Sequence, residues 1–355
     1  MLKVLKNTRR KALVIMALLA IITTSCLSEI EDVPNAPGEG IVIEGLVVNS
    51  EGGSYVRLFE LQSNGNIVNQ VPITGAVVGV FEGDPSGNPN VIFFPELELS
   101  PGFYRPDFNF SGQIGSEYTL SITLPDGTII QSNAQQMPAG FDIEDLDFEF
   151  AEKLNSEGFR EFFHDFFVSV KPQEENVFAR VASSGIAEAQ LQIIPPLPEC
   201  RDFTCIRPCW SFRSQLTPRD VVLISSATAN ERPFSFLAAS EAFDYHQRYY
   251  YEAAVYSLTA EAFQYWSALD QQLNVRGSLL DPRINELPSN LQSSNPEQTL
   301  FGFFGASAIS IEGFVFNRGT SAGFAKTVPV NNVYDCSERW EGGVNGANFT
   351  PIQFR

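Results

Sequence analysis

The chain has 355 residues, of which 44% are hydrophobic, and it contains 30 phenylalanines. This composition can fill a packed core, so we do not expect intrinsic disorder. The formal net charge of −19 is opposite to the basic footprint that nucleic acid or anionic lipid requires, so both classes of binding are excluded. The aromatic, glycine- and proline-rich composition favours β-structure.

The N-terminus has the parts of an export signal. A basic segment is followed by an uncharged apolar run at 12–22 and by small residues that precede Cys26. The apolar run has 11 residues, whereas a membrane-spanning helix needs about 20. We therefore predict a signal peptide at residues 1–25.

Cys26 is the predicted site of lipidation. The residues from Thr23 to Cys26 resemble the lipobox of bacterial lipoproteins, in which a signal peptidase cuts before a cysteine that carries a diacylglycerol. Thr23 departs from the leucine that is usual at its place, and an ordinary secretory signal with an incidental cysteine is the alternative. We expect the remaining chain to be soluble and tethered to a membrane by this lipid.

An acidic tether is predicted at residues 26–37. Glu29, Glu31 and Asp32 follow the cysteine closely and resemble the surface-export signal of Bacteroidota lipoproteins. A merely solvated linker is the alternative. Removal of residues 1–25 takes five of the 23 basic and none of the 42 acidic residues, which leaves a net charge of −24.

Residues 38–137 predict an immunoglobulin-like or transthyretin-like β-sandwich. Short β-branched or alternating runs recur there between turn residues, without a helical period. The clearest pair is 118–124 and 128–131, joined by Pro-Asp-Gly as a hairpin. The other predicted strands are 41–48, 55–61, 75–81, 91–94 and 103–105.

Residues 138–355 predict a larger β-rich domain that opens with an acidic strand at 142–150. Asp145, Asp147 and Glu149 would face one side of this strand, opposite an apolar face. A calcium loop is the alternative, but the glycine and the bidentate acid of an EF-hand are missing at their offsets. Further strands are predicted at 166–170, 177–181, 190–194, 221–224, 248–258, 300–310 and 313–316.

One helix is predicted in this second domain, near 260–273. Thr259 can cap it, and apolar residues such as Ala262 and Trp266 recur at steps of three and four. We expect its aromatic stripe to pack in the core. The stretch 281–297 reads as a loop.

Four cysteines remain for the mature chain, namely Cys200, Cys205, Cys209 and Cys336. An even number in an exported protein predicts two disulfides, and three connectivities are open. A zinc site is the alternative, although the spacing lacks the usual C-x2-C pair.

We find no motif that predicts an enzyme. The glycine-rich segment 319–323 fits the G-x-S-x-G pattern, but no helix pattern follows it and both histidines lie upstream. His164 and Asp165 are adjacent on a predicted strand, so their side chains should point to opposite faces. His246 lies among aromatic residues and is interpreted as structural. We predict no catalytic residue, no metal and no cofactor.

A set of segments together resembles one family. They are the runs 41–45, 74–78, 257–266, 277–282 and 300–308, together with the pair Cys209-Trp210. In this order they are similar to a family of Bacteroidota outer-membrane lipoproteins known only as a domain of unknown function (number 4249). The segment 283–290 departs from the family pattern. The resemblance implies a lipoprotein of the outer membrane, often encoded beside TonB-dependent receptors.

The resulting hypothesis is a non-enzymatic accessory or binding subunit for a TonB-dependent β-barrel receptor. It would be lipid-anchored in the outer membrane, with the cell-surface face favoured over the periplasmic face. Aromatic residues at 301–304 or 249–251 could contribute to binding, although core packing is the better interpretation for most of them. A structural or adhesion lipoprotein and a hydrolase with an unrecognised carboxylate site are the alternatives.

Overall fold

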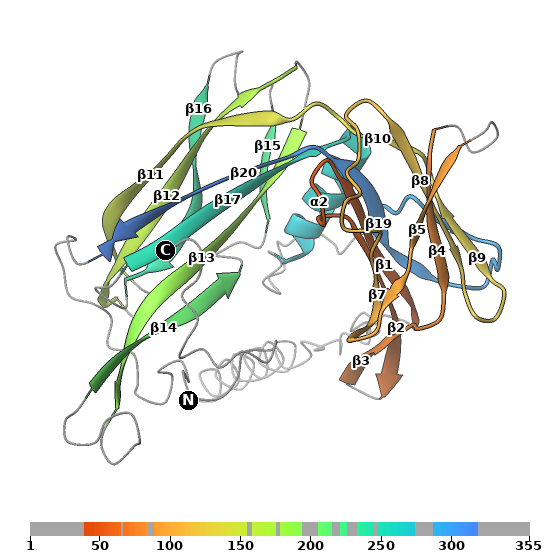
Figure 1. Ribbon diagram of the computed structural model, residues 1–355, viewed down its shortest axis with the longest axis horizontal. Helices are drawn as coiled ribbons and strands as arrows, with labels where there is room; N and C mark the ends of the chain where they lie inside the picture. The colour runs from red at the N-terminus through yellow and green to blue at the C-terminus, as the bar shows by residue number, and fades with distance from the viewer. Residues whose placement is uncertain are drawn as a thin grey trace, which may run out of the picture.

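Two β-rich lobes lie on either side of a single short helix in the described chain (Figure 1). The computed structural model describes residues 39–64, 67–83, 89–154, 158–174, 178–193, 205–214, 221–225, 233–243, 248–273 and 287–318. The helix is α2, Ala260–Leu273, and the predicted mainly β fold with this helix is confirmed. No helix in these ranges is long and apolar enough to cross a membrane.

The first lobe consists of two six-stranded sheets around one hydrophobic core. Its first sheet contains β1 (Gly40–Val48), β2 (Tyr55–Asn64), β3 (Ile67–Pro72), β6 (Glu96–Leu97), β7 (Ser100–Tyr104) and β19 (Leu300–Ser307). Its second sheet contains β4 (Val77–Glu82), β5 (Asn90–Phe94), β8 (Glu117–Thr123), β9 (Ile129–Ser132), β10 (Gln135–Gln136) and β18 (Leu291–Ser293). The immunoglobulin-like or transthyretin-like type of this lobe stays a prediction.

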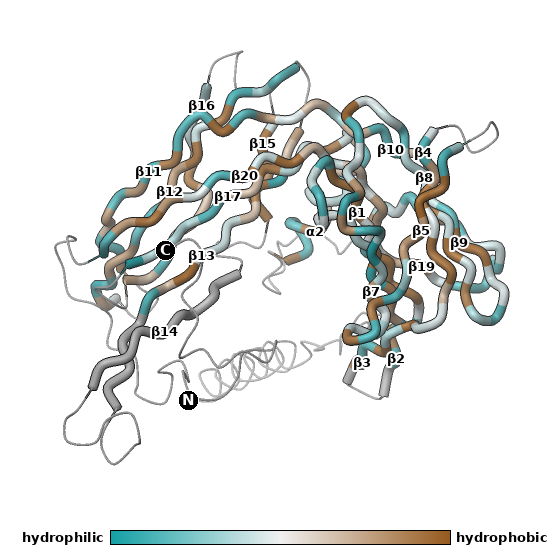
Figure 2. Tube along the Cα trace, in the orientation of Figure 1, coloured by the Kyte–Doolittle hydropathy of each residue, from teal (hydrophilic) through white to brown (hydrophobic). Residues whose placement is uncertain are grey.

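Alternation along the strands explains how the two sheets share one core. Residues Ile41 and Ile43 of β1 are buried while their neighbours are only half-buried, because successive side chains on a strand point to opposite faces. Figure 2 shows the same alternation of apolar and polar residues along many of the strands. Leu120 and Ile122 of β8 enter the core from the second sheet.

Two strands from late in the chain complete the first lobe. β19 pairs in parallel with β1, from Ile41 opposite Leu300 to Val48 opposite Ser307. β18 pairs with β9. The predicted boundary between 137 and 138 assigns both strands to the second domain, whereas their pairing assigns them to the first lobe. A parallel partner needs a long crossover connection, which no pattern within residues 38–137 could reveal.

The second lobe also has two sheets. One has the order β11-β12-β16, with β11 (Phe141–Leu154), β12 (Arg160–Pro172) and β16 (Phe234–Ala242). The other has the order β14-β13-β17-β20, and β15 pairs with β13. Its strands are β13 (Phe178–Ile193), β14 (Cys205–Ser214), β15 (Val222–Ser225), β17 (Arg248–Leu258) and β20 (Ile309–Asn317). Aromatic rings fill the space between these sheets, and Phe166 stacks on Tyr251 with 4.0 Å between ring centroids.

Some strands differ from the prediction. The predicted strands 177–181 and 190–194 are parts of one strand, β13. The residues between them, which include Ser-Ser-Gly, continue the strand beside β17, and a Cβ on Gly185 would collide with the Tyr249 side chain. The segment Cys205–Ser214, for which no strand was predicted, is β14 and extends the sheet beside β13. The strands β3 and β16 were not predicted.

Helix α2 packs against both lobes. Thr259 caps it as predicted, since its hydroxyl accepts a hydrogen bond of 3.1 Å from the backbone of Ala262. Phe263 stacks on Phe178 of the second lobe, with 4.5 Å between centroids. Tyr265 stacks on Phe303 of the first lobe, with 5.1 Å between centroids. Of the predicted apolar stripe, Ala262 is buried, Phe263 and Trp266 pack half-buried against the core, and Leu273 is exposed, so core packing holds for only part of it.

The parallel pairing yields a test at Gly302. This residue has a φ of 99°, and a Cβ on it would collide with the carbonyl oxygen of Ile43. We expect Gly302→Ala to lower the free energy of unfolding by about 3 kcal/mol, because it adds backbone strain and a clash. Gly305→Ala is the matched control, since its Cβ would lie 3.7 Å from the Leu46 side chain.

Urea denaturation of both variants measures this difference. The control should lose less than about 1 kcal/mol, as a methyl group in ordinary contact does. Equal stability of the two variants would contradict the described register of β19 on β1.

Candidate functional site

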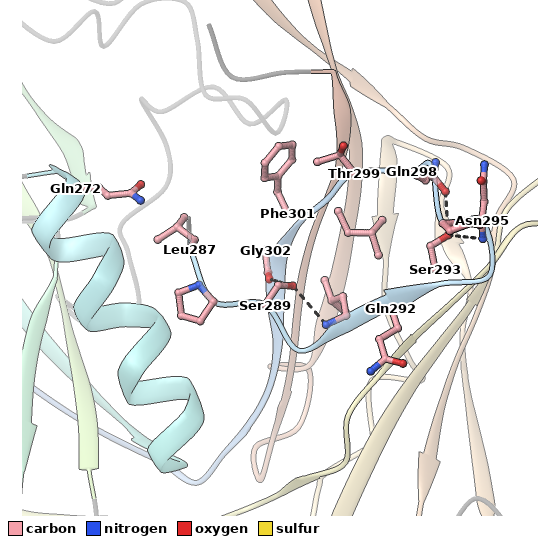
Figure 3. A pocket seen from close by; sticks show the side chains of 14 residues that line it. Gln272, Leu287, Ser289, Gln292, Ser293, Asn295, Gln298, Thr299, Phe301 and Gly302 are labelled. Atoms are coloured by element: carbon pink, nitrogen blue, oxygen red, sulfur yellow. Dashed lines mark hydrogen bonds between the residues drawn. The ribbon is translucent and has the colours of Figure 1, made fainter. Parts of the chain in front are cut away.

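A pocket of about 1080 Å³ lies between the C-terminal end of α2 and the segment that leads into β19 (Figure 3). Gln272 projects from α2 toward this segment, and Phe301 extends from the start of β19. The described lining consists of Gln272, Leu287, Pro288, Ser289, Leu291, Gln292, Ser293, Asn295, Pro296, Gln298, Thr299, Leu300, Phe301 and Gly302.

Hydrogen bonds hold the wall of this pocket in place. The amide of Asn290, which is buried, donates to the Phe304 carbonyl at 2.8 Å and accepts from the Phe304 backbone nitrogen at 3.1 Å. The Ser289 hydroxyl donates to the Gly302 carbonyl at 2.9 Å, and Ser293 contacts Gln298 at 3.3 Å. The segment before β19 is therefore fixed to the first lobe by side-chain contacts as well as by β18.

The described lining carries hydroxyl, amide and apolar groups, and no acidic or basic side chain is among them. Amides and hydroxyls both donate and accept hydrogen bonds, so they can bind neutral polar groups. General acid–base catalysis needs a titratable group within hydrogen-bond reach, which these lining residues do not supply. The arrangement is suited to binding. The sequence alone did not indicate this site, because 281–297 has no periodic pattern and reads as an ordinary loop.

Most of the aromatic residues considered for binding lie in the core or in the pocket, and Tyr250 lies half-buried against Ile186. Tyr249, Tyr251 and Phe304 are fully buried, and Phe303 is buried against α2. Core packing is thus confirmed for these four. Phe301, which is only half-buried, lines the pocket.

His164 and Asp165 point to opposite faces of β12, as the strand pattern predicts. The imidazole of His164 is buried, with its centroid 5.2–5.7 Å from the rings of four phenylalanines. Asp165 instead bonds on the outer face with Lys153 Nζ at 2.5 Å and Ser240 Oγ at 2.6 Å. A joint catalytic role of the two residues is incompatible with this placement. The acids Asp145, Asp147 and Glu149 are exposed on the same strand pair, as predicted for a solvated acidic face.

Burial, and after it the nearby charge of Arg318, lower the pKa of His164 from 6.5 to about 4, while Asp165 opposes the shift. The folded state therefore holds a neutral imidazole, and the unfolded state binds more protons between pH 6.5 and pH 4. Stability from this group is present above pH 6.5 and is lost as the pH falls toward 4.

We expect His164→Phe to remove this pH dependence. The wild type should lose about 3 kcal/mol more stability than the variant between pH 7 and pH 4, because a shift of one pKa unit corresponds to about 1.4 kcal/mol. Urea denaturation of both proteins at each pH measures the difference. If the free energies of unfolding of the two proteins fell in parallel with pH, His164 would have no lowered pKa.

The cysteines are only partly within the described chain. Cys205 and Cys209 lie on β14, whose backbone is described, whereas Cys200 and Cys336 lie outside the described residues. Four residues along a strand separate the two Cα atoms by about 13 Å. A disulfide needs Cα atoms within about 7 Å, and two thiolates on one zinc ion lie about 4 Å apart. The strand therefore excludes a Cys205–Cys209 disulfide and a single zinc site that contains both.

Peptide mapping under non-reducing conditions tests the disulfides that remain. If all four cysteines pair, Cys336 must bond to Cys205 or Cys209 in either remaining connectivity, and Cys200 must bond to the other. Trypsin should then release three peptides joined together, which contain Cys200, the segment 202–213 and Cys336. A two-peptide product that joins Cys200 to Cys336, with an internal bond in 202–213, would contradict the extended geometry of β14.

Other predicted residues lie outside the described part of the chain. These are Cys26 with the signal peptide and tether, His246, and the glycine-rich segment 319–323. Within the described ranges, no group of three or more His, Cys, Asp or Glu side chains could hold a metal ion.

The fold defines a mainly β protein of two lobes, each built from two sheets. Within that class, the family model described as "Domain of unknown function (DUF4249)" matches residues 29–311. The chain belongs to this family, and the match extends through both lobes to the β19 return. No curated protein matches the sequence.

Proposed function

We propose that the protein is a non-enzymatic binding lipoprotein of the outer membrane, which serves as an accessory subunit of a TonB-dependent β-barrel receptor. The pocket beside α2 is the observation that carries the binding part of this proposal. Its volume of about 1080 Å³ is ample for a small-molecule ligand. Its described lining offers hydrogen-bonding and apolar groups and no acid or base.

The lining chemistry favours a neutral ligand rich in hydrogen-bonding groups. Gln272, Gln292 and Gln298 can each donate and accept, and Phe301 offers a flat apolar face. Peptide amides and sugar hydroxyls share this chemistry. An ionic ligand would lose its hydration shell here without a counter-charge among the described lining residues.

The membrane and receptor parts of the proposal come from the N-terminal sequence and the family resemblance. Acylation of Cys26 would keep the acidic chain at the outer membrane, with its surface face favoured over the periplasmic face. A tethered binding subunit beside a barrel acts at a high effective concentration, so even modest affinity for the ligand would be sufficient.

Affinity purification from detergent-solubilised outer membranes tests the proposal. The tagged wild-type protein should recover a TonB-dependent β-barrel at a constant ratio. Cys26→Ala is the matched control, and it should appear in the soluble fraction without the barrel, because it lacks the acyl anchor.

Two results would count against the proposal. Recovery of the membrane-bound wild type alone, under mild detergent, would remove the receptor as a partner. Retention of Cys26→Ala in the membrane fraction would show that the anchor is elsewhere.

A further inference from the structure

Arg180 lies near the start of β13, a strand that contacts α2, and Figure 1 shows α2 between the two lobes. It is the cross-strand neighbour of Tyr256 on β17, and its guanidinium carbon lies 4.9 Å from the centre of that ring. The same carbon lies 4.2 Å from the ring of Trp266, which α2 supplies. Two aromatic rings from two different elements therefore hold this cation in one place.

No carboxylate pairs with this guanidinium among the described residues, and no acceptor there receives its hydrogen bonds. Arg57, Arg160 and Arg248 differ in this respect, since each has a glutamate oxygen at 3.0, 3.1 and 2.7 Å, respectively.

The position of the Arg180 guanidinium between two aromatic rings removes part of its hydration shell. Burial lowers the pKa of Arg180, and only the nearby Tyr256 and Tyr55 oppose that shift. A guanidinium nevertheless stays charged in a protein, and its five N–H groups remain donors. Its side chain is half-buried and is not fully enclosed, so these donors can be reached by a ligand.

Tyr55 brings the first lobe to the same site. It begins β2, stacks on Phe103 with 5.5 Å between centroids, and interacts electrostatically with Arg180. Burial raises the pKa of Tyr55, so its hydroxyl keeps its proton and can donate. A phenol of the first lobe therefore lies within electrostatic range of this cation of the second lobe.

We propose that Arg180, held by Tyr256 and Trp266 at the junction of the lobes, binds a carboxylate group of a small ligand. The planar fork of a guanidinium matches the two oxygens of a carboxylate. This site is separate from the uncharged pocket, whose described lining does not include Arg180.

Isothermal titration of the full-length mature lipoprotein in detergent tests the proposal, with succinate as the probe at constant ionic strength. We expect saturable binding by the wild type. Arg180→Gln should weaken it at least about tenfold, because the substitution removes one pair of charged hydrogen bonds. Arg160→Gln is the matched control, because Arg160 is exposed and pairs with Glu152. It should bind succinate like the wild type.

A further variant separates binding from folding. Tyr55→Phe keeps the cation and its two rings, so it should weaken succinate binding while the thermal midpoint stays unchanged. Binding should also change the tryptophan emission of the wild type, because the Trp266 ring lies 4.2 Å from the guanidinium carbon of Arg180.

Three results would overturn the inference. They are the absence of saturable succinate binding to the wild type, equal binding by folded Arg180→Gln, and tighter binding of inorganic phosphate than of succinate. The last result would replace the carboxylate with another anion. None of them bears on the receptor partnership, which affinity purification tests separately.

Discussion

The parallel pairing of β1 with β19 is the constraint on which the rest of the architecture depends. It brings residues from both ends of the described chain into one ladder, from Ile41 opposite Leu300 to Val48 opposite Ser307. The chain therefore passes from the first lobe into the second, forms most of its strands there, and then returns to the first lobe as β19. Immediately after β19, Ala308 exchanges hydrogen bonds with Ser257 of β17, which ties the return to the second lobe as well.

Both candidate sites result from this return. The segment 287–302, which Asn290 fixes to the first lobe, forms one side of the pocket. The end of α2 forms the other side. The helix is fixed by stacking on Phe178 in one lobe and on Phe303 in the other. Arg180 occupies the same junction. A flexible linker between the lobes would not form these stacking contacts. The junction is therefore a packed interface between the two lobes.

Local sequence patterns predicted local structure well. The alternation in 118–124 and the three- and four-residue steps after Thr259 correspond to β8 and α2, because strand and helix periods are properties of the chain itself. The parallel partner of β1, the pocket, and the placement of Arg180 between Tyr256 and Trp266 depend on contacts between distant residues. Periodicity carries no information on such contacts. In the sequence, Arg180 is a single basic residue in a predicted apolar strand. The alternation pattern does not show whether such a residue is held at a junction or lies at the surface.

The hydrogen bond from the Ile309 backbone to the Asn49 side chain spans 260 positions in the sequence, and the ladder before it spans almost as many. Contacts of such separation form slowly, since a long loop must close before they contribute. A chain exported from its N-terminus would expose the unpaired edge of β1 until β19 has followed it across the inner membrane. Open strand edges at that stage invite aggregation, so the export that we propose would require chaperones that protect β1 until β19 arrives.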